Sequence, residues 1–129
     1  MSRNLVLALK AIAVLTILSG LLQVVKPQWV LAVVGAEITA TSKHFFGIVG
    51  MFMALFGGML WQALVAERPQ PLPVFWCGLQ KLGATVAVGL GVSRDLFSWL
   101  ALGVAGFDLF SGALILAYWW TIRGPSARA

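Results

Sequence analysis

The chain of 129 residues carries very little charge, because Asp, Glu, Lys and Arg together make up only 10% of it. Soluble domains carry about 25% charged residues. A water-soluble fold needs such side chains to cover its surface, whereas lipid covers most of a multi-span membrane protein. Hydrophobic residues make up 60% of the chain, against ~45–50% in soluble domains. The composition excludes a soluble protein and predicts one membrane domain over residues 1–129.

Cysteine and histidine are equally scarce, since Cys77 and His44 are the only examples of each. One cysteine excludes an intrachain disulfide and any CxxC motif. One cysteine and one histidine leave too few soft ligands for a His/Cys metal site. The net charge of +5 is spread along the chain without a Lys/Arg cluster, which argues against a nucleic-acid partner. The sequence also lacks a Ser-His-Asp set, paired carboxylates and a phosphate-binding glycine loop, so we predict no catalytic residues, metal or cofactor.

Long hydrophobic runs are what the chain has instead. A transmembrane helix needs about 20 predominantly apolar residues, and four runs meet that length. We predict spans at residues 5–25, 44–66, 74–92 and 96–120. The first run is too long for a signal peptide and lacks a cleavage site. The six tryptophans lie near the ends of these spans, as expected at membrane–water boundaries. The predicted fold class is an all-α integral membrane protein, an antiparallel bundle of four transmembrane helices.

The connections between the runs carry turn and capping signals. In the first and longest connection, Thr41 or Ser42 can cap the second span. Three prolines fall within residues 69–73, where we expect a stiff turn that is not helical. Residues 93–95 form a very short turn, and Asp95 is a candidate N-cap of the fourth span.

Orientation follows from the distribution of Lys and Arg, which are enriched in cytoplasmic loops. The side that holds the termini carries Arg3, Lys10, Arg68, Arg123 and Arg128. The other side carries Lys26, Lys43 and Arg94. This asymmetry predicts that both termini are cytoplasmic. We expect a membrane of the bacterial inner-membrane type, although a thylakoid or organelle membrane would give the same pattern.

Small residues recur every four positions on two of the spans. They are Gly50, Ala54 and Gly58 on the second span and Gly83, Ala87 and Gly91 on the third. Small residues let transmembrane helices approach closely, and close packing drives their association in lipid. We interpret both sets as packing faces within the chain. The alternative is that they form a homo-oligomer or dock a membrane-protein partner.

Two charged residues, Lys81 and Asp108, lie inside apolar spans. Lys81 precedes Arg94 by 13 residues, and Asp108 follows it by 14. At ~1.5 Å per residue both lie about 20 Å from the turn, at one level near the bilayer centre. A charge at that depth costs roughly 2.5–3.5 kcal/mol on insertion scales. We therefore predict a buried Lys81–Asp108 ion pair between two antiparallel neighbouring helices.

Other polar residues extend this intramembrane site. Thr85 shares a helix face with Lys81, and Ser111 shares one with Asp108. Secondary polar candidates are His44, Gln80, Thr16, Ser19 and Gln23. The site has three interpretations: it sets helix register, it forms a proton relay or a lipid or quinone headgroup site, or a partner protein completes it.

The layout resembles the DoxX-like small four-helix bacterial membrane proteins. The features shared are a first span ending at Lys26-Pro27, a loop, and a glycine-bearing second span that opens His44-Phe45-Phe46-Gly47-Ile48-Val49-Gly50. The resemblance implies a four-helix membrane fold, and some proteins of that grouping look like partners of membrane redox systems. It transfers no functional residue to this chain.

Three functional hypotheses remain. Short loops and the lack of a soluble domain favour a non-enzymatic accessory or scaffold protein that joins a larger membrane assembly. The second is a small transporter or proton-coupled permeation unit that uses Lys81 and Asp108. The third is an enzyme acting on a lipid or quinone, with His44 beside the polar residues. We expect contact with membrane lipid and with a membrane-protein partner or a second copy of the chain.

Overall fold

The computed structural model describes residues 3–124, and every regular element in that range is an α-helix. In chain order the helices are α1 (Arg3–Val25), α2 (Pro27–Val33), α3 (Ala40–Val65), α4 (Pro71–Ser93) and α5 (Ala101–Ile122). Four of them, all except the short α2, are long and apolar enough to cross a membrane. This confirms the predicted fold class, an all-α membrane protein with four spans.

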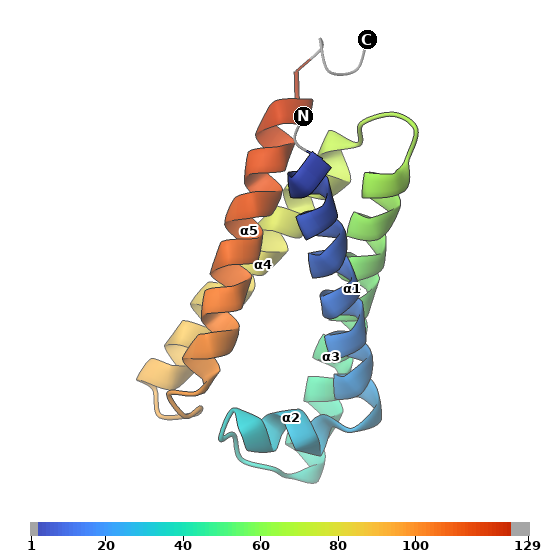
Figure 1. Ribbon diagram of the computed structural model, residues 1–129. Helices are drawn as coiled ribbons and strands as arrows, with labels where there is room; N and C mark the ends of the chain where they lie inside the picture. Colours follow the sequence, from blue (N-terminus) through green and yellow to red (C-terminus); the bar gives the residue numbers. More distant parts are fainter. Residues whose placement is uncertain (1–2, 125–129) are drawn as a thin grey trace.

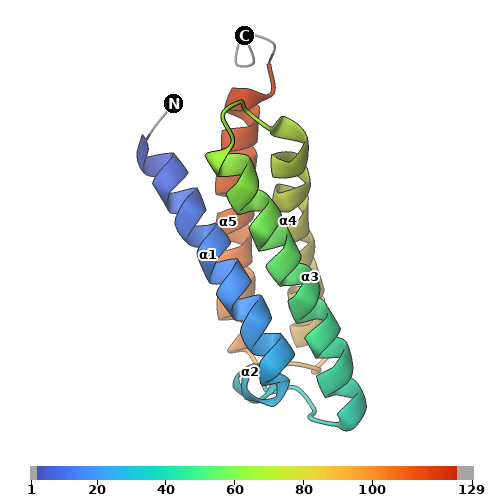
Figure 2. The same cartoon turned by 90° about the vertical axis from the view of Figure 1, so that its right-hand side faces the viewer.

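The four long helices form two pairs. Helix α1 packs along α3, and α4 packs along α5, with far fewer contacts between the pairs. The pairs meet near the chain termini and diverge toward the other end, so that Figure 1 shows an inverted V with α2 across its open end. In the view turned by 90°, α1 and α3 run together in front of α4 and α5 (Figure 2). The bundle therefore has a closed half and an open half.

Glycines bring the backbones of α1 and α3 into contact. A Cβ atom on Gly20 would collide with the carbonyl oxygen of Gly50 and would lie 2.7 Å from the amide nitrogen of Ala54. A Cβ on Gly57 would lie 3.0 Å from the carbonyl oxygen of Ala13. Gly50 and Ala54 thus occupy the helix-packing face that the sequence predicts, and no side chain fits between the helices at these points.

The α4–α5 pair uses small residues differently. A Cβ on Gly78 would lie 2.6 Å from Leu116, and one on Gly112 would lie 2.8 Å from Leu82. Here each glycine accommodates a leucine side chain of the neighbouring helix, so the two backbones stay further apart.

The predicted packing of Gly58 and Gly83 within the chain is wrong, because a Cβ at either position would meet nothing within 4 Å. Their alternative role, in an oligomer or against a partner, stays a prediction. A helix turns once per 3.6 residues, so a strict four-residue spacing drifts around it; Gly57, two turns from Gly50, faces α1 in place of Gly58. Ala87 is exposed and does not pack within the α4–α5 pair. Gly91 is buried, but against the ring of Phe97 in the following loop.

The hydrophobic core joins the two pairs in the half nearer the termini. It comprises Leu9, Ile12, Ala13, Leu60, Ala63, Leu64, Val74, Cys77, Ile115, Tyr118 and Ile122. All four long helices contribute to it. The thiol of Cys77 also donates a hydrogen bond to the carbonyl oxygen of Phe56, at 3.5 Å. This core holds the apex of the V together.

At the opposite end, the segment after α2 meets the loop between α4 and α5. The backbone N–H of Ser98 donates to the carbonyl oxygen of Val34 at 2.8 Å. The next residue, Gly35, has φ of +70°, and a Cβ there would lie 2.7 Å from Cβ of Ser98. Glycine suits this position because it has no Cβ and readily adopts a positive φ. The two helix pairs are thus also linked at their divergent ends.

The starts of α4 and α5 differ from the prediction. Helix α4 begins at Pro71, so Pro71 and Pro73 lie in its first turn, where the missing N–H has no intrahelical partner to lose. The expectation that this proline-rich stretch is entirely non-helical is wrong. Helix α5 begins at Ala101, later than predicted. Asp95 does not cap it, because Asp95 lies in the preceding loop with φ of +58°.

Helix α3 begins at Ala40, earlier than the predicted residue 44, and its N-cap is Thr39. The Thr39 hydroxyl accepts a hydrogen bond from the Ser42 N–H at 2.9 Å, and the Ser42 hydroxyl accepts one from the Thr39 N–H at 2.8 Å. Ser42 thus belongs to the capping box as its third helical residue, and the predicted N-cap at Thr41 or Ser42 is wrong.

The contact between α1 and α3 can be tested with Gly20→Ala. The added methyl group would push two backbones apart, so we expect a loss of about 1–3 kcal/mol in the free energy of unfolding. Gly58→Ala is the matched control, which adds the same methyl group without a collision, and it should leave this free energy unchanged or raise it by up to about 1 kcal/mol. Reversible unfolding in mixed detergent micelles, followed by tryptophan fluorescence, measures both. Equal effects at the two positions would contradict this packing arrangement.

Candidate functional site

The two intramembrane charges meet between α4 and α5. Nζ of Lys81 lies 3.5 Å from Oδ1 of Asp108, and the two side chains are 3% and 10% exposed. The structure thus contains the ion pair that their matched depth predicts. The pair forms although α5 begins five residues later than predicted. Between Ser98 and Gly103, backbone hydrogen bonds between residues three apart already give the chain a helical turn that leads into α5.

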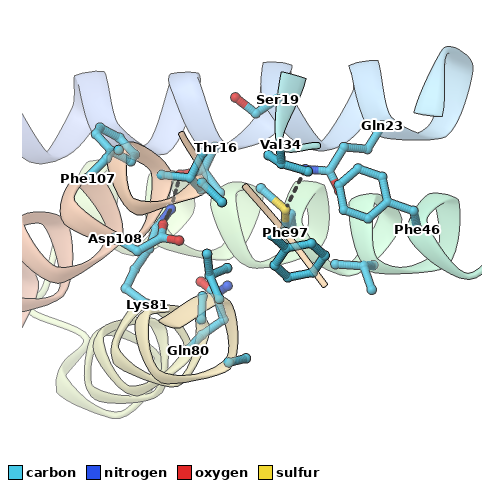
Figure 3. Close-up of a pocket in the computed structure, with 18 residues that line it drawn as sticks. Thr16, Ser19, Gln23, Val34, Phe46, Gln80, Lys81, Phe97, Phe107 and Asp108 are labelled. Carbon is cyan, nitrogen blue, oxygen red and sulfur yellow. Dashed lines mark hydrogen bonds and ion pairs between the residues drawn. The ribbon is translucent and has the colours of Figure 1, made fainter. Parts of the chain in front are cut away.

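A third residue completes this polar centre from the other helix pair. Nζ of Lys81 donates a hydrogen bond to Oγ1 of Thr16 on α1, at 2.6 Å. Thr16 is itself 2% exposed. We call Thr16, Lys81 and Asp108 the polar triad (Figure 3). The triad links α1 to the α4–α5 pair below the hydrophobic core.

The two residues predicted beside the ion pair do not contact its charged atoms. The Thr85 hydroxyl donates to the carbonyl oxygens of Lys81 at 3.1 Å and Ala105 at 3.3 Å, and so bridges the backbones of α4 and α5. Ser111 is fully buried, and its hydroxyl has no hydrogen-bond partner among residues 3–124. Thr85 thus joins the backbones of α4 and α5, and Ser111 is packed inside the bundle; neither hydroxyl bonds to the ion pair.

A cavity of about 460 Å³ opens between the two helix pairs, from the triad toward α2. Cavities of ~300–1,000 Å³ hold small-molecule ligands. Its polar lining consists of Thr16, Ser19, Gln23, Gln80, Lys81 and Asp108. Most other lining residues are apolar, and they include Phe46, Met53, Phe97, Val104 and Phe107. The cavity is thus an apolar chamber with a buried ion pair at its inner end (Figure 3).

Four of the five secondary polar candidates line this cavity. Thr16, Ser19 and Gln23 follow one face of α1, and Gln80 contributes from α4. Nε2 of Gln23 donates to the sulfur of Met53 at 3.1 Å. The fifth candidate does not join them: His44 is exposed at the start of α3, with its ring edge-on to Phe45 at 6.1 Å between ring centres.

Sequence reasoning missed the apolar half of the site and the partner of Thr16. Phe97 belongs to the α4–α5 loop, and Val34 follows α2. Both reach the cavity only because the Ser98–Val34 hydrogen bond draws these distant segments together. The recurring polar residues of α1 were the available signal, but they did not reveal which helix faces them.

The triad leaves Lys81 with capacity for a further bond. An ammonium group has three N–H donors. Lys81 directs one of them to Thr16 and one to Asp108. Nζ also lies 5.3 Å from the centre of the Phe107 ring, which lines the cavity, so the third donor lies at the cavity wall within reach of that ring or of an acceptor atom in the cavity. Because the Asp108 carboxylate balances the Lys81 charge, the triad offers directed hydrogen bonds without a large net charge.

Comparisons with protein-family models, with curated proteins and with solved structures find no match to this chain. The resemblance to DoxX-like proteins therefore stays a prediction. What the cavity can bind follows from its own shape, its polar triad and its apolar walls.

The ion pair can be tested with Lys81→Met and Asp108→Leu, singly and together. Either single change leaves a buried charge unpaired, and we expect each to cost about 3 kcal/mol of unfolding free energy. The double variant should recover more than half of the summed loss, because neither charge then remains. Lys43→Met, at an exposed position near the start of α3, is the matched control, with an expected change below about 0.5 kcal/mol.

The measurement is a double-mutant cycle from reversible unfolding in mixed micelles. A double variant whose loss equals the sum of the two single losses would show that Lys81 and Asp108 do not interact energetically.

Proposed function

We propose that this protein binds one neutral amphiphile from the bilayer in the cavity between its helix pairs. The observation that carries the proposal is an apolar chamber of about 460 Å³ that ends at a buried Lys81–Asp108 pair. The polar group of the ligand accepts a hydrogen bond from Lys81. Its apolar body lies against Phe46, Phe97 and Phe107.

Electrostatics favour a neutral ligand. An anionic group drawn to Lys81 would also approach the Asp108 carboxylate, which lies 3.5 Å from Nζ. A cationic group drawn to Asp108 would meet Lys81 in the same way. At low dielectric such like-charge contacts are strongly unfavourable. A carbonyl, ether or hydroxyl oxygen accepts from Lys81 without that penalty.

The position of the cavity supports entry from lipid. It lies between the pairs, away from the tightly packed faces within each pair, and its lining includes side chains with large accessible areas. Val49 is 49% exposed, and Val104 is 43% exposed. A ligand dissolved in the bilayer can reach the chamber between such side chains without crossing the core at the apex.

We place this binding in a non-enzymatic accessory protein of a bacterial-type inner membrane. Such a protein holds its ligand for, or together with, a membrane-protein partner or a second copy of the chain. The short connections between its helices support this role.

A second candidate is proton-coupled permeation through the same site. It is favoured by the polar residues Thr16, Ser19 and Gln23, which follow the cavity wall toward Lys81. Proteoliposomes under an imposed pH gradient separate the candidates. A binding protein leaves the gradient intact, whereas a relay dissipates it and loses that activity in the double Lys81→Met, Asp108→Leu variant.

Ligand binding can be tested by filling the cavity with Ala84→Phe. Ala84 lines the cavity, whereas Val86, two residues away on α4, is 62% exposed outside it. Val86→Phe is therefore the matched control. We expect native mass spectrometry of protein released from its membrane to show one neutral small amphiphile per chain in the wild type and in Val86→Phe, and at least a tenfold lower occupancy in Ala84→Phe.

Absence of a bound molecule from the wild type, or equal occupancy in both phenylalanine variants, would contradict the proposal. Thermal unfolding of the three proteins should be similar in the absence of ligand, which ensures that Ala84→Phe is read as a filled cavity and not as a misfolded chain.

The proposed orientation, with both termini cytoplasmic, can be tested by labelling. In a Cys77→Ala background, Glu37→Cys places a thiol in the exposed segment after α2, and Gln70→Cys places one in the exposed α3–α4 loop. A membrane-impermeant maleimide applied to intact spheroplasts should label the former only. Labelling of Gln70→Cys alone would reverse the orientation.

A further inference from the structure

Gln23 presents an unsatisfied hydrogen-bond acceptor to the cavity. Its side chain lines the chamber, and the residue is only 6% exposed. Its Oε1 atom has no hydrogen-bond partner among residues 3–124. Buried polar atoms are nearly always paired with protein or with a bound molecule. The atom therefore marks a place where something that donates a hydrogen bond belongs (Figure 3).

The chemistry of Met53 fixes which end of the Gln23 amide is unsatisfied. A thioether sulfur can only accept a hydrogen bond, so the amide nitrogen must face the Met53 sulfur, at 3.1 Å. The amide oxygen is then the free atom. Two other buried side-chain oxygens in the described residues lack partners, those of Ser98 and Ser111, but neither residue lines the cavity. Among the described residues, only Gln23 both carries an unpaired buried side-chain oxygen and lines the cavity.

The cavity thus offers opposite hydrogen-bonding groups at two places. Lys81 donates beside Thr16, and Gln23 accepts. Thr16 and Gln23 are seven residues apart on α1, a separation of about 10 Å along the helix. The cavity walls also include the rings of Phe97 and Phe107 and the side chain of Met53, which pack well against an aromatic body.

We propose, building on the proposed function, that the ligand is a neutral aromatic amphiphile with a hydroxyl at one end of its ring and an acceptor oxygen at the other. The hydroxyl donates to Oε1 of Gln23, and the acceptor oxygen receives a hydrogen bond from Nζ of Lys81. An attached alkyl chain leaves the cavity between the helix pairs into lipid. Hydrogen bonding at both ends would let the site select this class among the many apolar molecules of a membrane.

The test uses two probes that differ only in the donor. Para-hydroxyoctanophenone carries a phenol hydroxyl and a ketone oxygen on opposite sides of its ring, and para-methoxyoctanophenone replaces the hydroxyl with a methyl ether. Their affinities are measured by tryptophan fluorescence for the full-length wild type in detergent micelles, after removal of copurified amphiphile. We expect the phenol to bind at least tenfold more tightly, because the ether leaves Gln23 unpaired.

Gln23→Met removes the acceptor with little change in shape. We expect it to abolish the preference for the phenol while the ether binds as it does to wild type, which also reports that the variant is folded. Gln80→Met is the matched control, because it removes the other cavity amide, on α4, and should retain the preference.

Equal affinities of both probes for the wild type would overturn the inference and leave the proposed function standing, since a water molecule would then serve Gln23. A preference that survives in Gln23→Met, or that is lost in Gln80→Met alone, would also overturn it. Failure of both probes to bind the wild type would overturn the inferred ligand class, whereas absence of a copurified amphiphile in native mass spectrometry would overturn the proposed function itself.

Discussion

The hydrogen bond from Lys81 to Thr16 is the contact on which the arrangement depends. Lys81 and Asp108 neutralise each other within one helix pair, but Thr16 belongs to the other. Charge-assisted hydrogen bonds are about twice as strong as neutral ones, and in the middle of a membrane the lysine has no water to replace a lost partner. The triad therefore sets how closely the two pairs approach at mid-membrane. On the side of the triad nearer the chain termini the two pairs share the hydrophobic core, and on the side nearer α2 they separate.

The sequence was sufficient for features that depend on one helix or one short connection. Span length and low charge follow directly from the thickness and polarity of the bilayer, and they predicted four spans. The Lys81–Asp108 pair followed from depth alone, because antiparallel neighbours bring equal distances from a turn to one level. Helix packing was predicted less well. Gly50 was placed correctly. Gly58 was predicted to pack against a neighbouring helix, but Gly57 does so instead, because the helix has 3.6 and not four residues per turn.

The cavity lay beyond such reasoning because it depends on the angle between the two pairs. That angle depends on contacts far apart in the sequence: the hydrogen bond from Lys81 to Thr16, which joins the pairs at the triad, and the backbone hydrogen bond from Ser98 to Val34, which joins the divergent ends. Neither contact has a composition or spacing that marks it in advance. The polar residues of α1 indicated that this helix faces something polar, yet only the folded chain shows that they line a chamber.

The ion pair and the contents of the cavity are coupled. Coulomb attraction between Lys81 and Asp108 weakens as the local dielectric constant rises, and the cavity begins at the pair itself. Water throughout the chamber would screen the two charges and stabilise each of them alone, whereas an empty apolar chamber would deprive its walls of packing contacts. A neutral amphiphile avoids both costs: its apolar body keeps the pair dry and its polar atom uses the remaining donor of Lys81. Such a ligand would therefore preserve the attraction between Lys81 and Asp108 that joins α4 to α5 at the inner end of the cavity.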